Sequence, residues 1–93
     1  MQRHAFLLNT SRGDVIDEAA LIDALKDGHL AGAGLDVYEQ EPLVPAELIQ
    51  MENVVLLPHL GSATETTRIA MGMRVFDNLT AFFDGKEVPD QVA

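Results

Sequence analysis

The sequence contains no cysteine, no tryptophan, one tyrosine and only six basic residues in its 93. Without cysteine there is no disulfide and no thiolate chemistry. Fifteen acidic residues give a formal net charge of -9, which argues against nucleic acid or an anionic membrane as partner, because both need a cationic footprint. No apolar run approaches the roughly 20 residues that span a bilayer, and the first residues lack the apolar core of a secretory signal. We therefore expect a cytoplasmic protein.

What the sequence does contain is the composition of an ordinary globular protein, with 47% hydrophobic and 23% charged residues. Three apolar runs, residues 5–8, 30–38 and 54–57, are bounded by polar or turn-forming residues. Such runs are typical of strands that are buried on both faces of a parallel sheet. We expect three strands.

Two further segments have the periodicity of helices. In the first, Asp17 can cap a helix whose apolar residues recur at helical spacing until Gly28 provides a left-handed stop. The second begins at a capping-box pattern in residues 62–65 and runs to Gly85. Its apolar stripe consists of Ile69, Met73, Phe76, Leu79 and Phe83. Residues 46–50 are expected to add one short helical turn.

The order strand, helix, strand, loop, strand, helix predicts an α/β fold with a parallel sheet and crossover connections. Three fully apolar strands need helices on both faces, yet the sequence offers only two good helices. It also contains no Gly-x-Gly-x-x-Gly loop to cradle a pyrophosphate. We therefore expect the carboxyl-terminal piece of a larger α/β enzyme.

Three polar residues follow the three predicted strands: Arg12, Glu41 and His59. Because open α/β sheets place their chemistry at the carboxyl ends of the strands, these side chains should meet at one edge. Together they supply a cation that can hold an anion, a carboxylate and a proton carrier. This combination predicts an active site.

Each of these residues also has an ordinary interpretation when it is taken alone. Arg12 could be a salt-bridged surface cation, and His59 could cap the following helix. Glu41 could be one more carboxylate of an acidic loop, and Asp36 could cap backbone groups at a strand end. The joint occurrence of Arg12, Glu41 and His59 in one order favours the catalytic interpretation of these three residues. The three histidines lack metal-ligand spacing, so no metal site is expected.

The chain resembles the carboxyl-terminal part of the D-isomer-specific 2-hydroxyacid dehydrogenases through three segments that occur in the family's order. These segments are Asn9-Thr10-Ser11-Arg12-Gly13, Gly32-Ala33-Gly34-Leu35-Asp36-Val37 with Glu41-Pro42, and Pro58-His59-Leu60-Gly61-Ser62. The resemblance covers essentially all 93 residues. Residues 58–64, with Thr67 and Arg68, are most similar to the glyoxylate and hydroxypyruvate reductase branch.

The resemblance implies a Rossmann-type fold, with residues 1–62 as the carboxyl-terminal part of an NAD(P)-binding domain. Residues 63–93 would form a crossover helix and a tail towards the substrate domain. It further implies NAD or NADP as cofactor, a small anionic 2-keto acid as substrate and a homodimer as the full-length protein. The residue that would select between NAD and NADP lies outside this segment, and the segment alone is expected to be inactive.

The resemblance also implies roles for individual residues. Arg12 would fix the carboxylate and carbonyl of the 2-keto acid, Glu41 would pair with His59, and His59 would protonate the carbonyl oxygen as hydride arrives. The implied cofactor-binding residues are Thr10, Ser11, Arg12, Asp36, His59 and Gly61. These roles suit the chemistry, because histidine titrates near neutral pH and arginine binds a carboxylate bidentately.

Two other functions remain open at this point. The same fold could serve as an NAD(H)-sensing binding module, as in the corepressors that resemble this family, although a sensor needs no proton relay. Alternatively, the chain could be a stand-alone acidic interaction domain.

Overall fold

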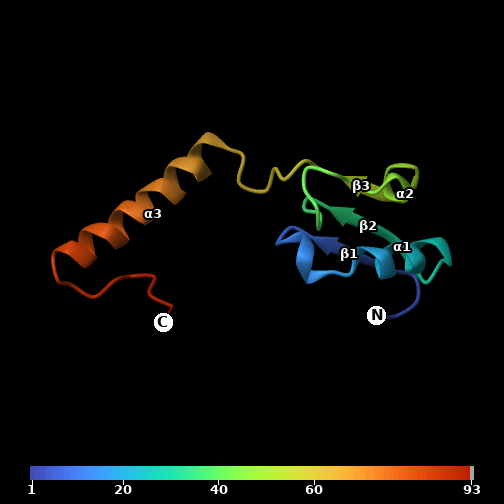
Figure 1. Cartoon of the computed structure of the whole chain (residues 1–93), viewed down its shortest axis with the longest axis horizontal. Helices are drawn as coiled ribbons and strands as arrows, with labels where there is room; N and C mark the ends of the chain where they lie inside the picture. The colour runs from blue at the N-terminus through green and yellow to red at the C-terminus, as the bar shows by residue number, and fades with distance from the viewer. Residues whose placement is uncertain (93) are drawn as a thin grey trace. The chain divides into compact units, whose positions relative to one another are not determined.

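The computed structural model describes residues 1–92, which belong to two compact units that divide between Gly61 and Ser62. The first unit contains strands β1 (Ala5–Asn9), β2 (Leu30–Leu35) and β3 (Val54–Leu56), helices α1 (Glu18–Lys26) and α2 (Ala46–Ile49), and a 3-10 turn at Gly13–Val15. The second unit contains helix α3 (Glu65–Phe83). Figure 1 shows these elements along the chain.

The three strands form one parallel sheet in the order β1-β2-β3, which confirms the expected α/β class. The carboxyl ends of the strands lie in register, since Asn9 pairs with Leu35 and Leu35 pairs with Leu56. The loops that follow these three residues therefore start from the same edge of the sheet. This register is what brings distant polar residues of the sequence together.

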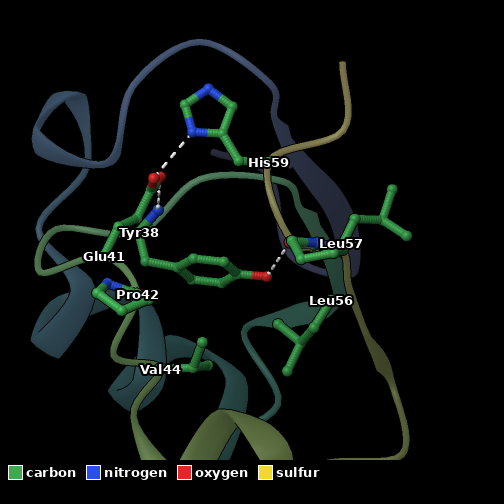
Figure 2. Close-up of a pocket in the computed structure, with 8 residues that line it drawn as sticks. Tyr38, Glu41, Pro42, Val44, Leu56, Leu57 and His59 are labelled. Carbon is green, nitrogen blue, oxygen red and sulfur yellow. Dashed lines mark hydrogen bonds and ion pairs between the residues drawn. The ribbon is translucent and has the colours of Figure 1, made fainter. Parts of the chain in front are cut away.

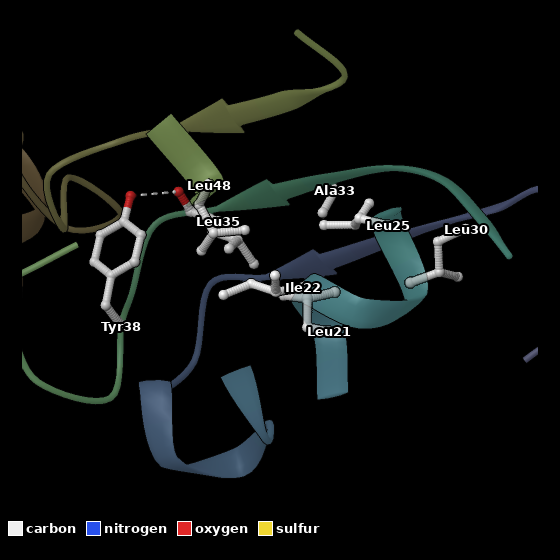
Figure 3. Close-up of a cluster of buried hydrophobic side chains, with 8 residues drawn as sticks. All are labelled: Leu21, Ile22, Leu25, Leu30, Ala33, Leu35, Tyr38 and Leu48. Carbon is white, nitrogen blue, oxygen red and sulfur yellow. Dashed lines mark hydrogen bonds between the residues drawn. The ribbon is translucent and has the colours of Figure 1, made fainter. Parts of the chain in front are cut away.

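Helix α1 forms as the sequence predicts. The Asp17 side chain accepts a hydrogen bond of 3.1 Å from the Ala20 amide, and after the helix Gly28 has the left-handed φ of 78°. The helix buries Leu21, Ile22 and Leu25 against β2. Figure 3 shows these side chains with the other buried members of the core, Leu30, Ala33, Leu35, Tyr38 and Leu48.

The expectation that the strands are buried on both faces is wrong for this unit. Phe6 and Leu8 of β1 are 71% and 77% exposed, and Val55 of β3 is 63% exposed. Alternate side chains of a strand point to opposite faces, and the core that α1 completes lies on the other face. The sheet therefore has one packed and one open apolar face among the residues described.

Strands β2 and β3 are also shorter than predicted. β2 ends at Leu35 instead of Tyr38, because β1 ends at Asn9 and the Asp36 amide makes the last bond to it, 3.0 Å from the Asn9 carbonyl oxygen. β3 ends at Leu56 instead of Leu57. The residues after these ends turn towards the candidate site.

The second unit is helix α3 with its tail. Thr64 caps the helix by accepting a 3.2 Å hydrogen bond from the Thr67 amide. The capping residue therefore lies two residues after Ser62, with which the predicted capping box began. The apolar stripe of α3 is exposed over its whole length. After the helix, Asp90 bonds back to Arg74 and Asn78. In residues 1–92 no helix is long and apolar enough to cross a membrane.

Candidate active site

The residues that follow the three strand ends meet as predicted. Arg12, Glu41 and His59 line one shallow depression. The Arg12 charge is close enough to act on the Glu41 carboxylate. The guanidinium, the carboxylate and the imidazole therefore occupy one surface at the carboxyl edge of the sheet.

Arg12 is presented by a turn that Asn9 holds together. Asn9 is only 6% exposed, and its amide nitrogen donates to the Arg12 carbonyl at 2.9 Å while its side-chain oxygen accepts from the Ser11 amide at 3.1 Å. The guanidinium is exposed and donates to the Ser11 carbonyl at 2.8 Å. Sequence analysis gave Asn9 no role; a polar residue closing an apolar strand was the available signal.

Gly13 allows this turn to approach the loop that carries Glu41. A β-carbon at residue 13 would lie 1.9 Å from the carbonyl carbon of Tyr38 and 2.0 Å from its oxygen. No side chain fits such a gap. Because Gly13 has no side chain, the turn that carries Arg12 can pack against the backbone of residues 38–41.

Glu41 and His59 form a hydrogen-bonded pair (Figure 2), with 2.8 Å between Nδ1 of the histidine and Oε2 of the glutamate. The other oxygen, Oε1, accepts from the Tyr38 amide at 3.1 Å. Two hydrogen bonds lower the pKa of Glu41: the larger effect comes from the His59 ring and the smaller one from the Tyr38 amide. The ionised carboxylate can only accept, so Nδ1 carries the proton in this hydrogen bond and Nε2 takes no part in it.

The turn around His59 has a fixed geometry. His59 has a φ of 59°, which is uncommon for a residue with a side chain. Directly after it, the amides of Leu60 and Gly61 donate to the two oxygens of Asp36 at 2.7 and 2.8 Å. Asp36 is 3% exposed, and its buried charge is compensated by these bonds. The Asp36 side chain therefore caps backbone groups, as the ordinary interpretation of this residue expected.

The residues predicted to bind a cofactor lie at the same edge. Thr10 and Ser11 are exposed after β1, while Asp36 and Gly61 meet where the loops after β2 and β3 touch. A nicotinamide carboxamide needs both acceptors and donors, and carboxylate oxygens can each accept a second hydrogen bond. The residue types and their position at the carboxyl edge therefore fit a nicotinamide. Among residues 1–92, no group of three or more potential ligand side chains could hold a metal ion.

Tyr38 is a site residue that sequence analysis missed, having counted it only as the end of a strand. The residue is 6% exposed, and it lines a hollow of about 280 Å³ whose wall also includes Glu41 and His59. The hydroxyl donates to the Leu57 carbonyl at 2.7 Å (Figure 2). It also lies 3.1 Å from the Leu35 carbonyl oxygen (Figure 3). Burial raises the pKa of this hydroxyl, so it stays a donor.

Known proteins resemble this chain over almost its whole length. The chain is 59% identical over 87 residues to glyoxylate/hydroxypyruvate reductase B of Erwinia tasmaniensis, an alignment that covers 92% of the chain and 27% of the relative. It is 54% identical over 93 residues to glyoxylate reductase of Korarchaeum cryptofilum, covering 99% of the chain and 28% of the relative. The chain therefore spans between a quarter and a third of the length of these relatives.

Solved structures of related proteins also superpose closely on this chain. The NADPH-dependent glyoxylate/hydroxypyruvate reductase of Sinorhizobium meliloti, in complex with NADP and malonate, superposes with a TM-score of 0.89 at 50% identity. That alignment covers 99% of this chain and 29% of the reductase. The D-mandelate dehydrogenase of Rhodotorula graminis superposes with a TM-score of 0.88 at 39% identity, covering 100% of this chain and 27% of that one.

Residues 1–61 match the family described as D-isomer specific 2-hydroxyacid dehydrogenase, NAD binding domain. The match contains Arg12, Glu41 and His59, and it confirms the resemblance that the three sequence segments indicated. The Rossmann-type fold class is confirmed by the superpositions. The chain belongs to the D-isomer specific 2-hydroxyacid dehydrogenase family.

Proposed function

We propose that this chain is the carboxyl-terminal part of an NAD(P)-dependent 2-hydroxyacid dehydrogenase that reduces glyoxylate or hydroxypyruvate. The observation that carries the proposal is the Glu41–His59 pair, 2.8 Å between Nδ1 and Oε2, on the same depression as Arg12. In this proposal residues 1–62 complete a dinucleotide-binding domain and residues 63–93 run towards a substrate domain.

Each residue of the trio has a task in this reaction. Arg12 binds the substrate carboxylate, which a planar and always charged group can hold by two parallel hydrogen bonds. His59 donates the proton of Nε2 to the carbonyl oxygen, where negative charge develops. Glu41 stabilises the charged imidazolium and fixes the plane of the ring, because Tyr38 and His59 hold both of its oxygens.

The cofactor in this proposal is NAD or NADP, and a bound nicotinamide supplies the hydride. The residues that would border it are Thr10, Ser11, Arg12, Asp36, His59 and Gly61. The Sinorhizobium meliloti relative, which is NADPH-dependent, supports a nicotinamide cofactor. We further propose that the whole protein is a cytoplasmic homodimer, the homodimer being what the family resemblance implies.

A chimera tests the proposed function. The chain replaces the aligned segment of the Sinorhizobium meliloti reductase, and NADPH and NADH oxidation is measured with glyoxylate and hydroxypyruvate. We expect turnover with at least one of these acids, and its loss by several orders of magnitude in His59→Ala. Turnover that survives His59→Ala would contradict the proposed proton donor. Dinucleotide binding without turnover would instead favour the nucleotide-sensing alternative.

A further inference from the structure

We propose that Tyr38 is a positioning residue that holds Glu41 and His59 in their paired arrangement. Its backbone amide and its phenol hydroxyl act on opposite members of the pair. The effect on catalysis rests on the proposed function, whereas the positioning itself is a property of this chain and can be measured without turnover.

The backbone of Tyr38 holds the glutamate. The Tyr38 amide donates to Oε1 of Glu41 at 3.1 Å, while Oε2 faces His59. With both oxygens engaged, the carboxylate has one orientation. The Tyr38 backbone is itself held in place, because Gly13 packs directly against its carbonyl group.

The side chain of Tyr38 holds the histidine. Its hydroxyl donates to the carbonyl of Leu57, two residues before His59, at 2.7 Å. On the other side of His59, Asp36 accepts from the amides of Leu60 and Gly61. Tyr38 and Asp36, which both follow β2, thus hold the His59 turn from its two sides. These contacts explain how His59 keeps its left-handed φ of 59°.

Tyrosine is suited to this task because it combines a buried ring with a polar tip. Its ring lies in the apolar hollow beside Val44 and Leu56, and its tip reaches the backbone at the end of β3 (Figure 2). Phenylalanine would fill the same space without the hydroxyl. Tyr38→Phe therefore separates positioning from packing.

The charged groups around the pair are known and remain in this variant. Arg12 and His59 act on Glu41. Asp36, Glu18 and Glu41 act on Tyr38. A change in the titration of Glu41 in Tyr38→Phe therefore reports a change in geometry and not a change in the number of charges.

The first test is NMR on the 93-residue chain, following the side-chain carboxyl carbon of Glu41 through an acid titration. In Tyr38→Phe we expect the carboxyl to titrate at higher pH than in the unchanged chain, because the His59 turn loses the bond to Leu57 and the pair loosens. Val44→Ala is the matched control: it lines the same hollow, so it should lower thermal stability yet leave the Glu41 titration in place. Superimposable titrations of Tyr38→Phe and the unchanged chain would overturn the proposal.

A second measurement needs no destabilising substitution. Tyr38 is the only tyrosine of the chain, so fluorotyrosine incorporation places one ¹⁹F reporter at this position. We expect the ¹⁹F shift to change with the same midpoint as the Glu41 carboxyl. A ¹⁹F shift that does not change when Glu41 is protonated would count against the coupling of Tyr38 to Glu41.

The kinetic test uses the chimera. Tyr38→Phe should lower kcat for glyoxylate reduction about tenfold, the effect of one lost hydrogen bond, with little change in KM. Val44→Ala should leave kcat unchanged. A chimera without any turnover would count against the proposed function alone, since the two NMR measurements still decide the role of Tyr38. Equal kcat in Tyr38→Phe and the unchanged chimera would contradict the proposed effect of Tyr38 on catalysis.

Discussion

At the scale of single residues, backbone amides and one uncharged side chain hold the charged groups of the site. Asn9 holds the turn of Arg12, the Tyr38 amide holds Glu41, and the amides after His59 bond to Asp36. None of the buried side-chain polar atoms in the described residues lacks a partner. Such satisfied contacts favour one geometry of the site.

The role of Arg12 can be tested by separating charge from shape. Arg12→Lys in the chimera keeps the positive charge but loses the planar fork that binds a carboxylate bidentately. A charge-assisted pair of this kind contributes on the order of 3 kcal/mol, so kcat/KM should fall roughly a hundredfold. Steady-state reduction of glyoxylate beside NADPH titration measures this, and cofactor affinity should change much less. Near-normal kcat/KM would reduce Arg12 to a structural cation.

The lowered pKa of Glu41 predicts a pH dependence of stability. Its hydrogen bonds from His59 and Tyr38 favour the ionised form, so their contribution is present above the unfolded-state pKa and is lost as pH falls through the folded value. Glu41→Gln should therefore be less stable than the unchanged chain at about pH 6, and the difference should be smaller at about pH 3. Thermal unfolding at both pH values measures this.

The control for this experiment is Glu52→Gln, which changes an exposed glutamate with the same formal charge. It should show no comparable pH-dependent difference. Both side chains of the pair are partly exposed, Glu41 at 35% and His59 at 45%, so the effect should also weaken at high salt. A pH-independent difference in Glu41→Gln would contradict the prediction.

Sequence reasoning predicted that Arg12, Glu41 and His59 lie together because strand ends in a parallel sheet share one edge, a rule that needs no coordinates. It did not identify Asn9 or Tyr38 as site residues. Their contribution depends on which backbone groups lie within hydrogen-bond distance after folding, the Arg12 carbonyl for one and the Leu57 carbonyl for the other. Side-chain type alone does not encode these partners.

At the scale of elements, the sequence predicted the helices and strands but only some of their limits. Asp17 and Gly28 delimit α1 as expected, because capping is a local property. The cap of α3 moved to Thr64, whose extended backbone suits the position before a helix. The end of β2 depended on where its neighbour β1 ends, which is a tertiary property and therefore not visible in the sequence of β2 alone.

Gly13 provides a test at this scale, because it controls how the loop after β1 packs on the loop after β2. Gly13→Ala would place a β-carbon 1.9 Å from the Tyr38 carbonyl carbon, so one loop must move. We expect a loss of about 3 kcal/mol in unfolding free energy, as for overpacked cores. Chemical denaturation measures this loss, and the Arg12 and Glu41 resonances should shift with it.

The matched control is Gly72→Ala. Gly72 lies inside α3, and a β-carbon there would meet nothing within 4 Å. Alanine is the better helix former by about 1 kcal/mol, so this change should stabilise α3 or leave it unchanged. Equal effects of the two substitutions would show that glycine removal, and not the contact with Tyr38, sets the outcome.

At the scale of the whole molecule, the sheet of the first unit has two unlike faces. Leu7 faces the core that α1 covers, whereas Leu8 on the next position is 77% exposed. Parallel sheets in folded proteins are covered on both faces. The open face therefore fits the proposal that this chain is one part of a larger dinucleotide-binding domain.

Substitutions at these two neighbouring positions test that proposal. In the 93-residue chain Leu8→Gln should leave the thermal midpoint nearly unchanged, because the side chain is already in water. In the chimera the rest of the domain should cover it, and the same change should cost about 2 kcal/mol, the value of burying one leucine. Leu7→Gln is the control, since its side chain packs against the core and should destabilise both proteins. If Leu8→Gln has the same small effect in the chimera as in the chain, then this face of the sheet stays open and residues 1–62 do not complete a two-sided dinucleotide-binding domain.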